Sequence, residues 1–180
     1  YVTSDAHGHV RALDEALSKI SLTSDDTLYV LGDMIDRGPD PVGVIKLVRS
    51  LPNAHVLKGN HEQIMLDAII GQDPLDAETW DINGGWTTRE QLNDMEFEAY
   101  EELVRWMAAL PLYAVVETEE RPYLLVHAGI EMKAARAFLL EHGVDCADGV
   151  GAVSADRELL QQMLAVQSSD DLLWIRHGYW

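Results

Sequence analysis

Four short segments of the sequence carry residue types that can bind metal ions or transfer protons. Each follows an apolar run rich in β-forming residues, and each contains a glycine that lets the backbone turn sharply. Because ligands in open α/β sheets bind beyond the carboxyl ends of strands, we expect one site to collect all four segments. The segments are Asp5-Ala6-His7-Gly8, Gly32-Asp33-Met34-Ile35-Asp36-Arg37-Gly38, Gly59-Asn60-His61-Glu62 and His127-Ala128-Gly129.

Five of these residues have the donor atoms of a mixed oxygen and nitrogen metal site. Asp5 and His7 are two positions apart, so in an extended segment both side chains point to one side. Asp33 can serve two cations at once, while Asn60 offers a neutral carbonyl oxygen and His127 an imidazole. Such ligands without cysteine suit Mn, Fe or Zn and argue against a structural zinc site. The sequence therefore predicts a metal-binding site for divalent ions.

The other polar residues of these segments suit hydrolysis of phosphate esters. His61 adjoins a metal ligand and can act as general acid for the leaving alcohol, with Asp36 orienting its ring. Arg37 and Arg176 are positive forks that match phosphate oxygens. A pair of metal ions lowers the pKa of a bridging water and holds the phosphoryl oxygens. A lone His127 on an apolar strand would more often be a packed or surface histidine, so the specific signal is the ordered set of four segments.

The elements that must position these residues alternate between strand and helix, which predicts an α/β fold class. Gly71–Trp86 is expected to be irregular, because it contains Pro74, Gly84 and Gly85. The expected strands are Tyr1–Thr3, Thr27–Leu31, Ala54–Leu57, Leu112–Val116, Tyr123–Val126 and Leu172–Ile175. The expected helices are Val10–Ile20, Pro39–Leu51, Glu62–Ile70, Phe97–Ala109, Lys133–Glu141 and Asp156–Ala165.

The four segments resemble the motifs GDxHG, GDxxDRG, GNHE and HAG of the calcineurin-like metallophosphoesterases, in particular the bacterial serine/threonine phosphoprotein phosphatases. The match is nearly residue by residue, except that Ser4 replaces the first glycine. Asn83-Gly84-Gly85 with Thr87 or Thr88 resembles a feature of the bacterial members. So does the segment from Asp171 to Arg176.

The resemblance implies a metallophosphoesterase β-sandwich with helices on both outer faces, here one domain over residues 1–180 that is incomplete at its C-terminal end. It also implies two metal ions, with manganese expected and Fe or Zn as alternatives. The implied metal ligands are Asp5, His7, Asp33, Asn60 and His127, and the implied catalytic residues are His61, Asp36, Arg37 and Arg176.

One departure from the family concerns the second metal ion. The family supplies a further metal-binding histidine from a later strand, and the sequence stops at Trp180 before that strand and the closing strands of the sandwich. His177 is the nearby candidate for this ligand, although a histidine at the rim of the pocket is the favoured interpretation.

The resemblance implies a hydrolase, and the favoured hypothesis is a protein phosphatase acting on phosphoserine and phosphothreonine. An alternative is a symmetrical dinucleoside tetraphosphate hydrolase, in which Trp80 or Trp86 could form a platform for a base; packing in the core or at the rim is an equal interpretation of both tryptophans. An alternative of another class is an inactive, metal-poor binding module, which only the absent late histidine supports.

Composition narrows the expected partners. The net charge is -18 and no basic patch is visible, which disfavours nucleic acid and anionic membrane as partners. The expected partner is a phosphorylated protein or a small phosphoester, and the oligomeric state stays open. A single cysteine, Cys146, allows no internal disulfide, and no apolar run is long enough to span a bilayer. We therefore expect a cytoplasmic protein.

Overall fold

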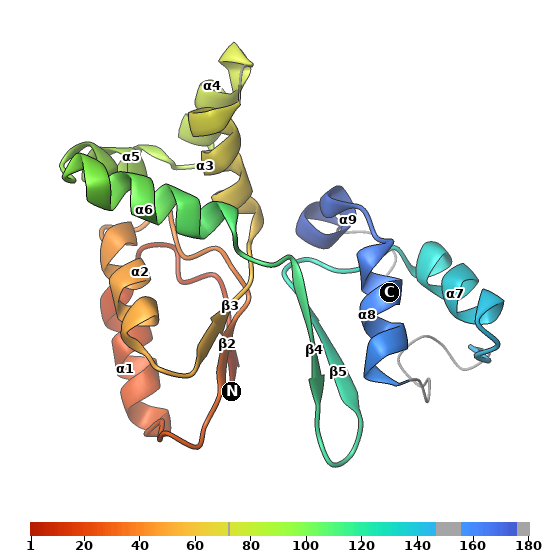
Figure 1. Ribbon diagram of the computed structural model, residues 1–180. Coiled ribbons are helices and arrows are strands. Elements are labelled where there is room, and N and C mark those ends of the chain that lie inside the picture. The colour runs from red at the N-terminus through yellow and green to blue at the C-terminus, as the bar shows by residue number, and fades with distance from the viewer. Residues whose placement is uncertain (72, 147–155, 176–180) are drawn as a thin grey trace. The chain divides into compact units, whose positions relative to one another are not determined.

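Three short parallel strands carry the first three motif segments. In the computed structural model, which describes residues 1–71, 73–146 and 156–175, these strands form one sheet in the order β1-β2-β3 (Figure 1). Tyr29 of the central strand pairs with Val2 on one side and with His55 on the other. Since all three strands run in the same direction, their carboxyl ends meet at one edge of the sheet. The strands are β1 (Val2–Thr3), β2 (Leu28–Val30) and β3 (Ala54–Val56).

Six helices accompany this sheet within the compact unit Tyr1–Pro111. Helices α1 and α2 lie beside each other along the sheet (Figure 1). Helix α2 starts at Pro41 and not at the predicted Pro39, because the carboxylate of Asp40 accepts the N–H of Gly43 and caps the helix. The helices are α1 (Val10–Ile20), α2 (Pro41–Ser50), α3 (Asn60–Ile70), α4 (Pro74–Ile82), α5 (Trp86–Asn93) and α6 (Phe97–Ala108).

The prediction of an irregular segment from Gly71 to Trp86 was wrong over most of its length. Residues 74–82 form helix α4, and helix α5 begins at Trp86. The side chain of Asp73 accepts the N–H of Leu75, and Pro74 takes the first helical position, where its missing N–H costs nothing. Pro74 therefore starts a helix, and only the turn between the two helices is irregular.

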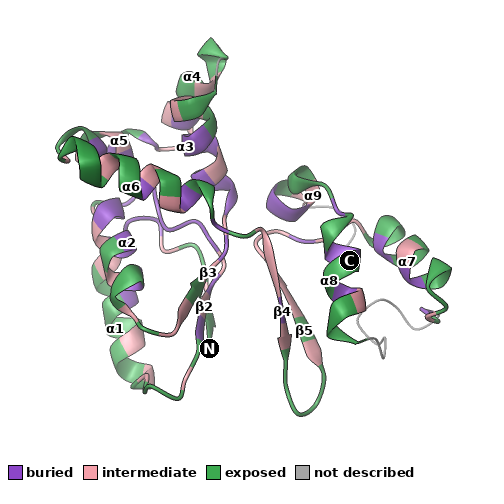
Figure 2. Cartoon of the chain, viewed as in Figure 1, coloured by how far each residue is buried: buried purple, intermediate pink, exposed green. Residues whose placement is uncertain are grey.

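The apolar faces of these helices and strands enclose one core. Buried members come from every layer, as the purple bands of Figure 2 show on the inner sides of the helices. Met65 of α3 and Met107 of α6 are completely buried in this core. Other members of this core are Leu13, Val30, Val44, Ile45, Val48 and Leu103.

The compact unit Leu112–Trp180 has a separate core. In its described residues, the two predicted strands are present as β4 (Tyr113–Glu117) and β5 (Pro122–Val126), which pair antiparallel with Val115 opposite Leu124. Its described helices are α7 (Met132–Glu141), α8 (Arg157–Ala165) and α9 (Ser169–Trp174). Val115, Leu139 and Met163 are buried together in this core. The prediction of one domain over residues 1–180 stays a prediction.

The predicted strand Leu172–Ile175 is instead part of helix α9. The hydroxyl of Ser168 accepts the N–H of Asp171 and caps this helix. Leu172 and Leu173 are both buried. A short apolar run cannot be assigned to strand or helix by periodicity alone, and here the serine cap decides the outcome.

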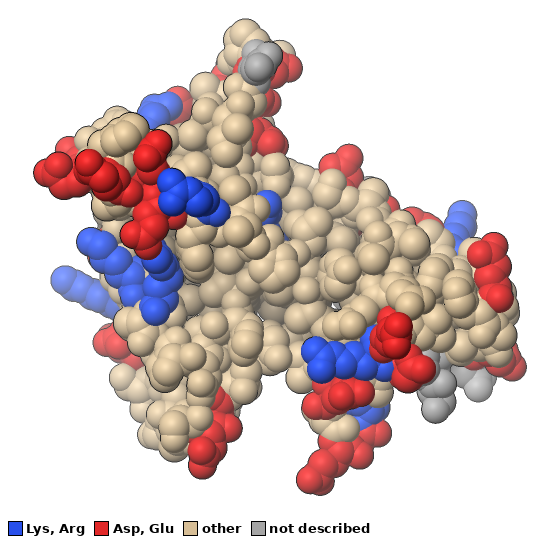
Figure 3. All heavy atoms as spheres, viewed as in Figure 1, with Lys and Arg blue, Asp and Glu red and all other residues tan. Residues whose placement is uncertain are grey.

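The predicted α/β fold class is confirmed. Within the described residues, no helix combines the length and the apolar character that crossing a bilayer would demand. Asp and Glu side chains occur at several places on the face drawn in Figure 3, and some of them stand beside a Lys or Arg side chain. Two ion pairs in the described residues are Arg49–Glu102 and Arg89–Asp81. Ion pairs as exposed as these contribute little to stability.

Candidate active site

The ends of the three parallel strands bring the first two motif segments together. The N–H of Asp5 donates to the carbonyl of Gly32 (3.2 Å), and the N–H of His7 donates to the carbonyl of Asp33 (2.9 Å). The segment after β1 therefore lies beside the segment after β2, because these backbone bonds extend the pairing of the strands. The structure thus brings the first two segments together, and the expectation that one site collects all four segments stays a prediction.

The backbone of both segments is held in an unusual conformation. Asp5 (φ 56°) and His7 (φ 41°) lie in the left-handed region, so the prediction of an extended Asp5–His7 segment was wrong. Asp33 (φ 54°), Asp36 (φ 69°) and Arg37 (φ 66°) share this conformation. Non-glycine residues adopt it at an energetic cost, and such residues cluster at functional sites. Because of these turns, the side chains of the two segments have orientations that a regular strand would not give them.

Two glycines let the segments approach closely. Gly32 has φ 87°, and a Cβ atom there would lie 2.2 Å from the backbone nitrogen of Gly59. A Cβ atom on Gly59 would lie 2.3 Å from Oδ1 of Asp33. Only glycine fits at either position, so the sequence places the carboxylate of Asp33 directly against the start of α3.

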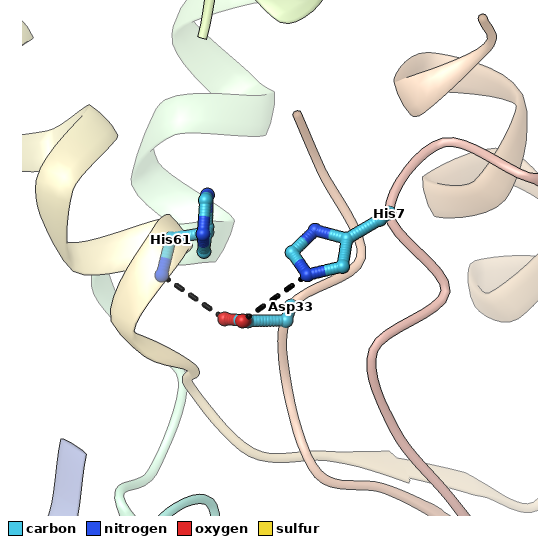
Figure 4. Close-up of side chains that lie close together, drawn as sticks. All are labelled: His7, Asp33 and His61. Carbon is cyan, nitrogen blue, oxygen red and sulfur yellow. Dashed lines mark hydrogen bonds and ion pairs between the residues drawn. The ribbon is translucent and has the colours of Figure 1, made fainter. Parts of the chain in front are cut away.

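His7, Asp33 and His61 form the cluster that is best suited to a metal ion among the described residues. Their candidate ligand atoms all lie within 4.8 Å of one another, and all three residues are buried. In Figure 4, both histidines lie next to the carboxylate of Asp33. Nε2 of His7 is 3.5 Å from Oδ2 of Asp33 and 3.9 Å from Oδ1 of Asp5. The backbone N–H of His61 donates to Oδ1 of Asp33 (3.0 Å).

The ring of His7 is arranged as a metal ligand should be. Its Nδ1 lies 2.9 Å from the carbonyl of Ile35, which can only accept, so the proton is on Nδ1 and the lone pair on Nε2 faces Asp33. Burial lowers the pKa of His7, and the nearby charge of Arg37 acts in the same direction, while the Ile35 bond and Asp33 oppose it. A neutral imidazole beside two carboxylates fits a divalent ion that prefers mixed oxygen and nitrogen ligands.

His61 is held from its other ring nitrogen. Nδ1 of His61 lies 2.7 Å from Oδ2 of Asp36, and both side chains are fully buried. The indole N–H of Trp80 and the hydroxyl of Thr88 also donate to the carboxylate of Asp36. The predicted pair of His61 and Asp36 is thus present in the described geometry, and two residues that the prediction did not include support it.

Arg37 connects the two histidines. Its guanidinium lies 2.9 Å from Nε2 of His7 and 2.7 Å from Nε2 of His61. Because a guanidinium only donates, both Nε2 atoms act as acceptors here. The ring centroids of the histidines are 4.7 Å apart. Arg37 is otherwise exposed, so it adds a positive charge at the open side of the cluster.

Glu62 holds the backbone around Asp33 from inside the protein. Its carboxylate accepts the N–H groups of Asp33, Met34 and Gly59, each at 2.8 Å. Burial and the neighbouring charge of Asp33 raise the pKa of Glu62, and the three backbone donors oppose that shift. Glu62 thus ties the turn after β2 to the start of α3.

The remaining predicted site residues are placed as follows. Asn60 is the first residue of α3 and is buried directly before His61. His127 follows the end of β5 in the second unit and is half-buried. Arg176 and His177 lie outside the described residues. The structure therefore brings together Asp5, His7, Asp33, Asp36, Arg37 and His61, with Asn60 adjoining them in sequence.

Three side chains support the site through contacts that the sequence did not predict. Trp80 and Thr88 bind Asp36, and Glu62 binds the backbone at Asp33. Thr88 and Glu62 both belong to segments that the motifs single out. Trp80 lies outside these motifs. Its contact with Asp36 depends on helix α4, which was not predicted from the sequence. Trp80 is buried, and so does not form an exposed platform, whereas Trp86 is exposed.

Comparison with known proteins identifies similar chains. A family model described as calcineurin-like phosphoesterase matches residues 1–177. A symmetrical bis(5′-nucleosyl)-tetraphosphatase from Erwinia tasmaniensis is 31% identical over 133 residues, which cover 72% of this chain and 44% of the relative. The protein of the same name from Proteus mirabilis is 32% identical over 135 residues, with the same coverage of 72% and 44%. The chain thus spans less than half the length of these curated relatives.

Two solved structures have a similar fold. One is described as a putative diadenosine tetraphosphatase, with a TM-score of 0.52 and 24% identity over 73% of this chain and 50% of that chain. The other is a protein serine/threonine phosphatase from Saccharomyces cerevisiae, with a TM-score of 0.51 and 20% identity over 74% of this chain and 38% of that chain. At these identities the likeness concerns the fold alone.

Proposed function

This chain belongs to the calcineurin-like phosphoesterase family, and we propose that it is a metal-dependent hydrolase that cleaves dinucleoside tetraphosphates symmetrically. The observation that carries the enzymatic part of this proposal is the buried cluster of His7, Asp33 and His61 with the guanidinium of Arg37 between the two rings. Burying two imidazoles and a carboxylate costs free energy unless these groups have polar partners or bind a metal ion, and their arrangement suits metal binding.

We assign Asp5, His7, Asp33 and Asn60 as metal ligands for divalent ions, two by the family resemblance and manganese by expectation, while His127 stays a prediction from that resemblance. The ligand set has oxygen and nitrogen donors and no cysteine, which fits such ions. When bound, the ions would supply an activated water and positive charge for the phosphate oxygens. The carbonyl of Ile35 accepts the Nδ1 proton of His7, which fixes the tautomer of the ring. The lone pair on Nε2 is then available to bind a metal ion.

His61 and Arg37 are the residues that act on the substrate in this proposal. His61 presents Nε2 to the leaving oxygen, because Asp36 holds its Nδ1 side. A histidine ring held in this orientation can serve as a general acid for the leaving group. Arg37, at the open side of the cluster, has further N–H groups besides the two that donate to His7 and His61, and these can bind phosphate oxygens. Arg176 is assigned the same role from the family resemblance.

The substrate class rests on the relatives. The curated relatives described above are tetraphosphatases, which favours the dinucleoside tetraphosphate hypothesis over the phosphoprotein hypothesis that the motifs suggested first. A tetraphosphate also presents several anionic oxygens to the cations of the site. Symmetrical cleavage breaks the central phosphoanhydride bond and yields two nucleoside diphosphates.

The test is hydrolysis by the full chain after treatment with chelator and addition of Mn²⁺. The substrates are a symmetrical dinucleoside tetraphosphate, a phosphothreonine peptide and p-nitrophenyl phosphate, assayed with the wild type, Asp33→Asn and His61→Ala. We expect metal-dependent release of two nucleoside diphosphates, reduced about 10²-fold or more in both variants.

Other outcomes would reject parts of the proposal. Turnover of the phosphopeptide without turnover of the tetraphosphate would reinstate a protein phosphatase. Absence of hydrolysis with any divalent metal would leave the inactive binding module as the explanation of the site.

A further inference from the structure

Asp36 has more partners than a residue that only orients His61 requires. Its Oδ2 atom lies 2.7 Å from Nδ1 of His61. The indole N–H of Trp80 donates to both carboxylate oxygens (3.0 and 3.2 Å), and the hydroxyl of Thr88 donates to Oδ1 (2.6 Å). All four side chains are at most 3% exposed. In such surroundings each hydrogen bond is strengthened, because water does not compete for the partners.

Thr88 binds Asp36 at two points. Its hydroxyl donates to Oδ1 and also accepts the backbone N–H of Asp36 (2.9 Å). A hydroxyl has one proton and two lone pairs, so both bonds form at once. The backbone of Asp36 is in the left-handed region (φ 69°), where it needs support from its surroundings. Thr88 thus fixes the main chain and the carboxylate of the same residue.

The turn Asn83-Gly84-Gly85 places both of these partners. The carbonyl of Gly84 accepts the N–H of Arg37 (3.0 Å), which attaches the turn to the segment that contains Asp36. A Cβ atom on Gly85 would lie 2.2 Å from the indole of Trp80, so only glycine leaves room for that ring. The metal ligands do not account for these features. They are explained if the segment exists to hold Trp80 and Thr88 against Asp36.

We propose that Trp80 and Thr88 are positioning residues for the general acid of this site. Thr88 binds Oδ1 and the indole of Trp80 bridges both oxygens, which fixes the plane of the Asp36 carboxylate with Oδ2 toward Nδ1 of His61. Nε2 of His61 then points to the side of Arg37 and His7. Without the two donors the carboxylate could rotate about its terminal torsion, which is broad for Asp. The kinetic part of this inference rests on the proposed function.

A spectroscopic test does not depend on activity. In metal-free protein, the Nδ1 proton of His61 is observed by proton NMR and assigned by its loss in His61→Ala. We expect this signal to shift or broaden in Thr88→Val, which removes the hydroxyl and keeps the shape of the side chain, and in Trp80→Phe, which removes the indole N–H and keeps a smaller aromatic ring. Thr88→Ser keeps both hydrogen bonds and should restore the signal. Thr87→Val is the matched control, because the hydroxyl of Thr87 donates to Gly84 and not to Asp36.

A kinetic test separates positioning from general loss of structure. Because general acid catalysis contributes about 10²–10⁴-fold, a misaligned acid in Thr88→Val or Trp80→Phe should lower kcat by about tenfold or more, with KM within about twofold of the wild type. The loss should be larger for phenyl phosphate than for p-nitrophenyl phosphate, since nitrophenolate leaves with little help from a proton. Thr88→Ser should recover most of kcat, and Thr87→Val should retain it.

The two tests fail independently. An unchanged His61 signal in both Thr88→Val and Trp80→Phe would overturn the positioning role, whether or not the wild type is active. An equal loss of kcat with both leaving groups would overturn it as well. If Thr88→Val does not fold, Trp80→Phe decides the question. Absence of turnover by the wild type rejects the proposed function. The NMR test alone then decides whether Trp80 and Thr88 position Asp36 and His61.

Discussion

The two compact units differ in what they bury. The unit Tyr1–Pro111 buries charged and polar side chains beyond the ends of its strands and on helix α5, namely His7, Asp33, Asp36, Asn60, His61, Glu62, Thr87 and Thr88. In the described part of the unit Leu112–Trp180, Gln167 is the buried polar residue, and the core consists of side chains such as Leu139 and Met163. Among the described residues, the non-glycine residues with positive φ also all lie in the first unit.

This difference indicates which kinds of substitution each unit tolerates. A buried polar group must have its partner in place, so each substitution near Asp33 or Asp36 disturbs several hydrogen bonds together. A core of aliphatic side chains tolerates changes that keep volume and shape. We therefore expect the first unit to respond to the loss of single atoms and the second to the loss of volume.

The largest expected effect contrasts two glycines with similar backbone angles. Gly32 (φ 87°) would place a Cβ atom 2.2 Å from the backbone of Gly59, whereas Gly143 (φ 77°) in the second unit has no atom within 4 Å of that position. We expect Gly32→Ala to destabilise the protein by about 4 kcal/mol or more, because backbone must move. Gly143→Ala should cost about 1 kcal/mol, from left-handed strain alone.

Urea denaturation of both variants measures this contrast. Equal losses of stability in the two alanine variants would show that strain, and not the close approach of two backbones at the site, governs both glycines. Retention of metal binding by Gly32→Ala would contradict the role of that approach in placing Asp33.

A smaller effect is expected from removing volume in the second unit. Leu139 is fully buried in the core that also contains Val115 and Met163, so Leu139→Ala should cost about 3 kcal/mol. Hydrogen exchange should show weaker protection in β4, β5, α7 and α8, with α1 and α2 unchanged. Equal loss of protection in α1 and α2 would mean that the two cores unfold as one, and the comparison of separate units would fail.

The smallest of the three effects comes from a single atom in the first unit. Glu62→Gln replaces one carboxylate oxygen by an amide group that cannot accept, so at least one of the three backbone N–H groups loses its partner. An unsatisfied buried donor costs about 2 kcal/mol, measurable as a shift of the urea midpoint. The control is Glu102→Gln, at an exposed ion pair with Arg49, where we expect no measurable change. If the urea midpoint shifted equally in Glu62→Gln and Glu102→Gln, the expectation that the buried carboxylate contributes more to stability than the exposed one would be wrong.

The sequence predicted most elements, because their signals are local. Helix α1 has the predicted bounds Val10–Ile20, since its apolar residues repeat with helical spacing. Helix α4 was missed because Asp73 and Pro74 were taken as loop residues, although the same pair also caps and starts a helix. Helix α9 was assigned as a strand because its apolar run is too short to show a period.

The site was predicted in residue types better than in geometry. Spacing after strands was enough to group His7, Asp33 and His61. The left-handed turns at Asp5 and His7 were not predictable, because contacts distant in sequence impose them. The same holds for Trp80, whose bond to Asp36 joins residues 44 positions apart.

Trp80 also gives the protein an internal optical reporter. Indole emission responds to the electric field along the ring, and the indole of Trp80 is buried with its N–H on the carboxylate that holds His61. Any change of charge among these groups therefore alters its fluorescence without an attached dye. Because the chain has five tryptophans, events at the site should be visible in real time as a change in the part of the emission that is lost in Trp80→Phe.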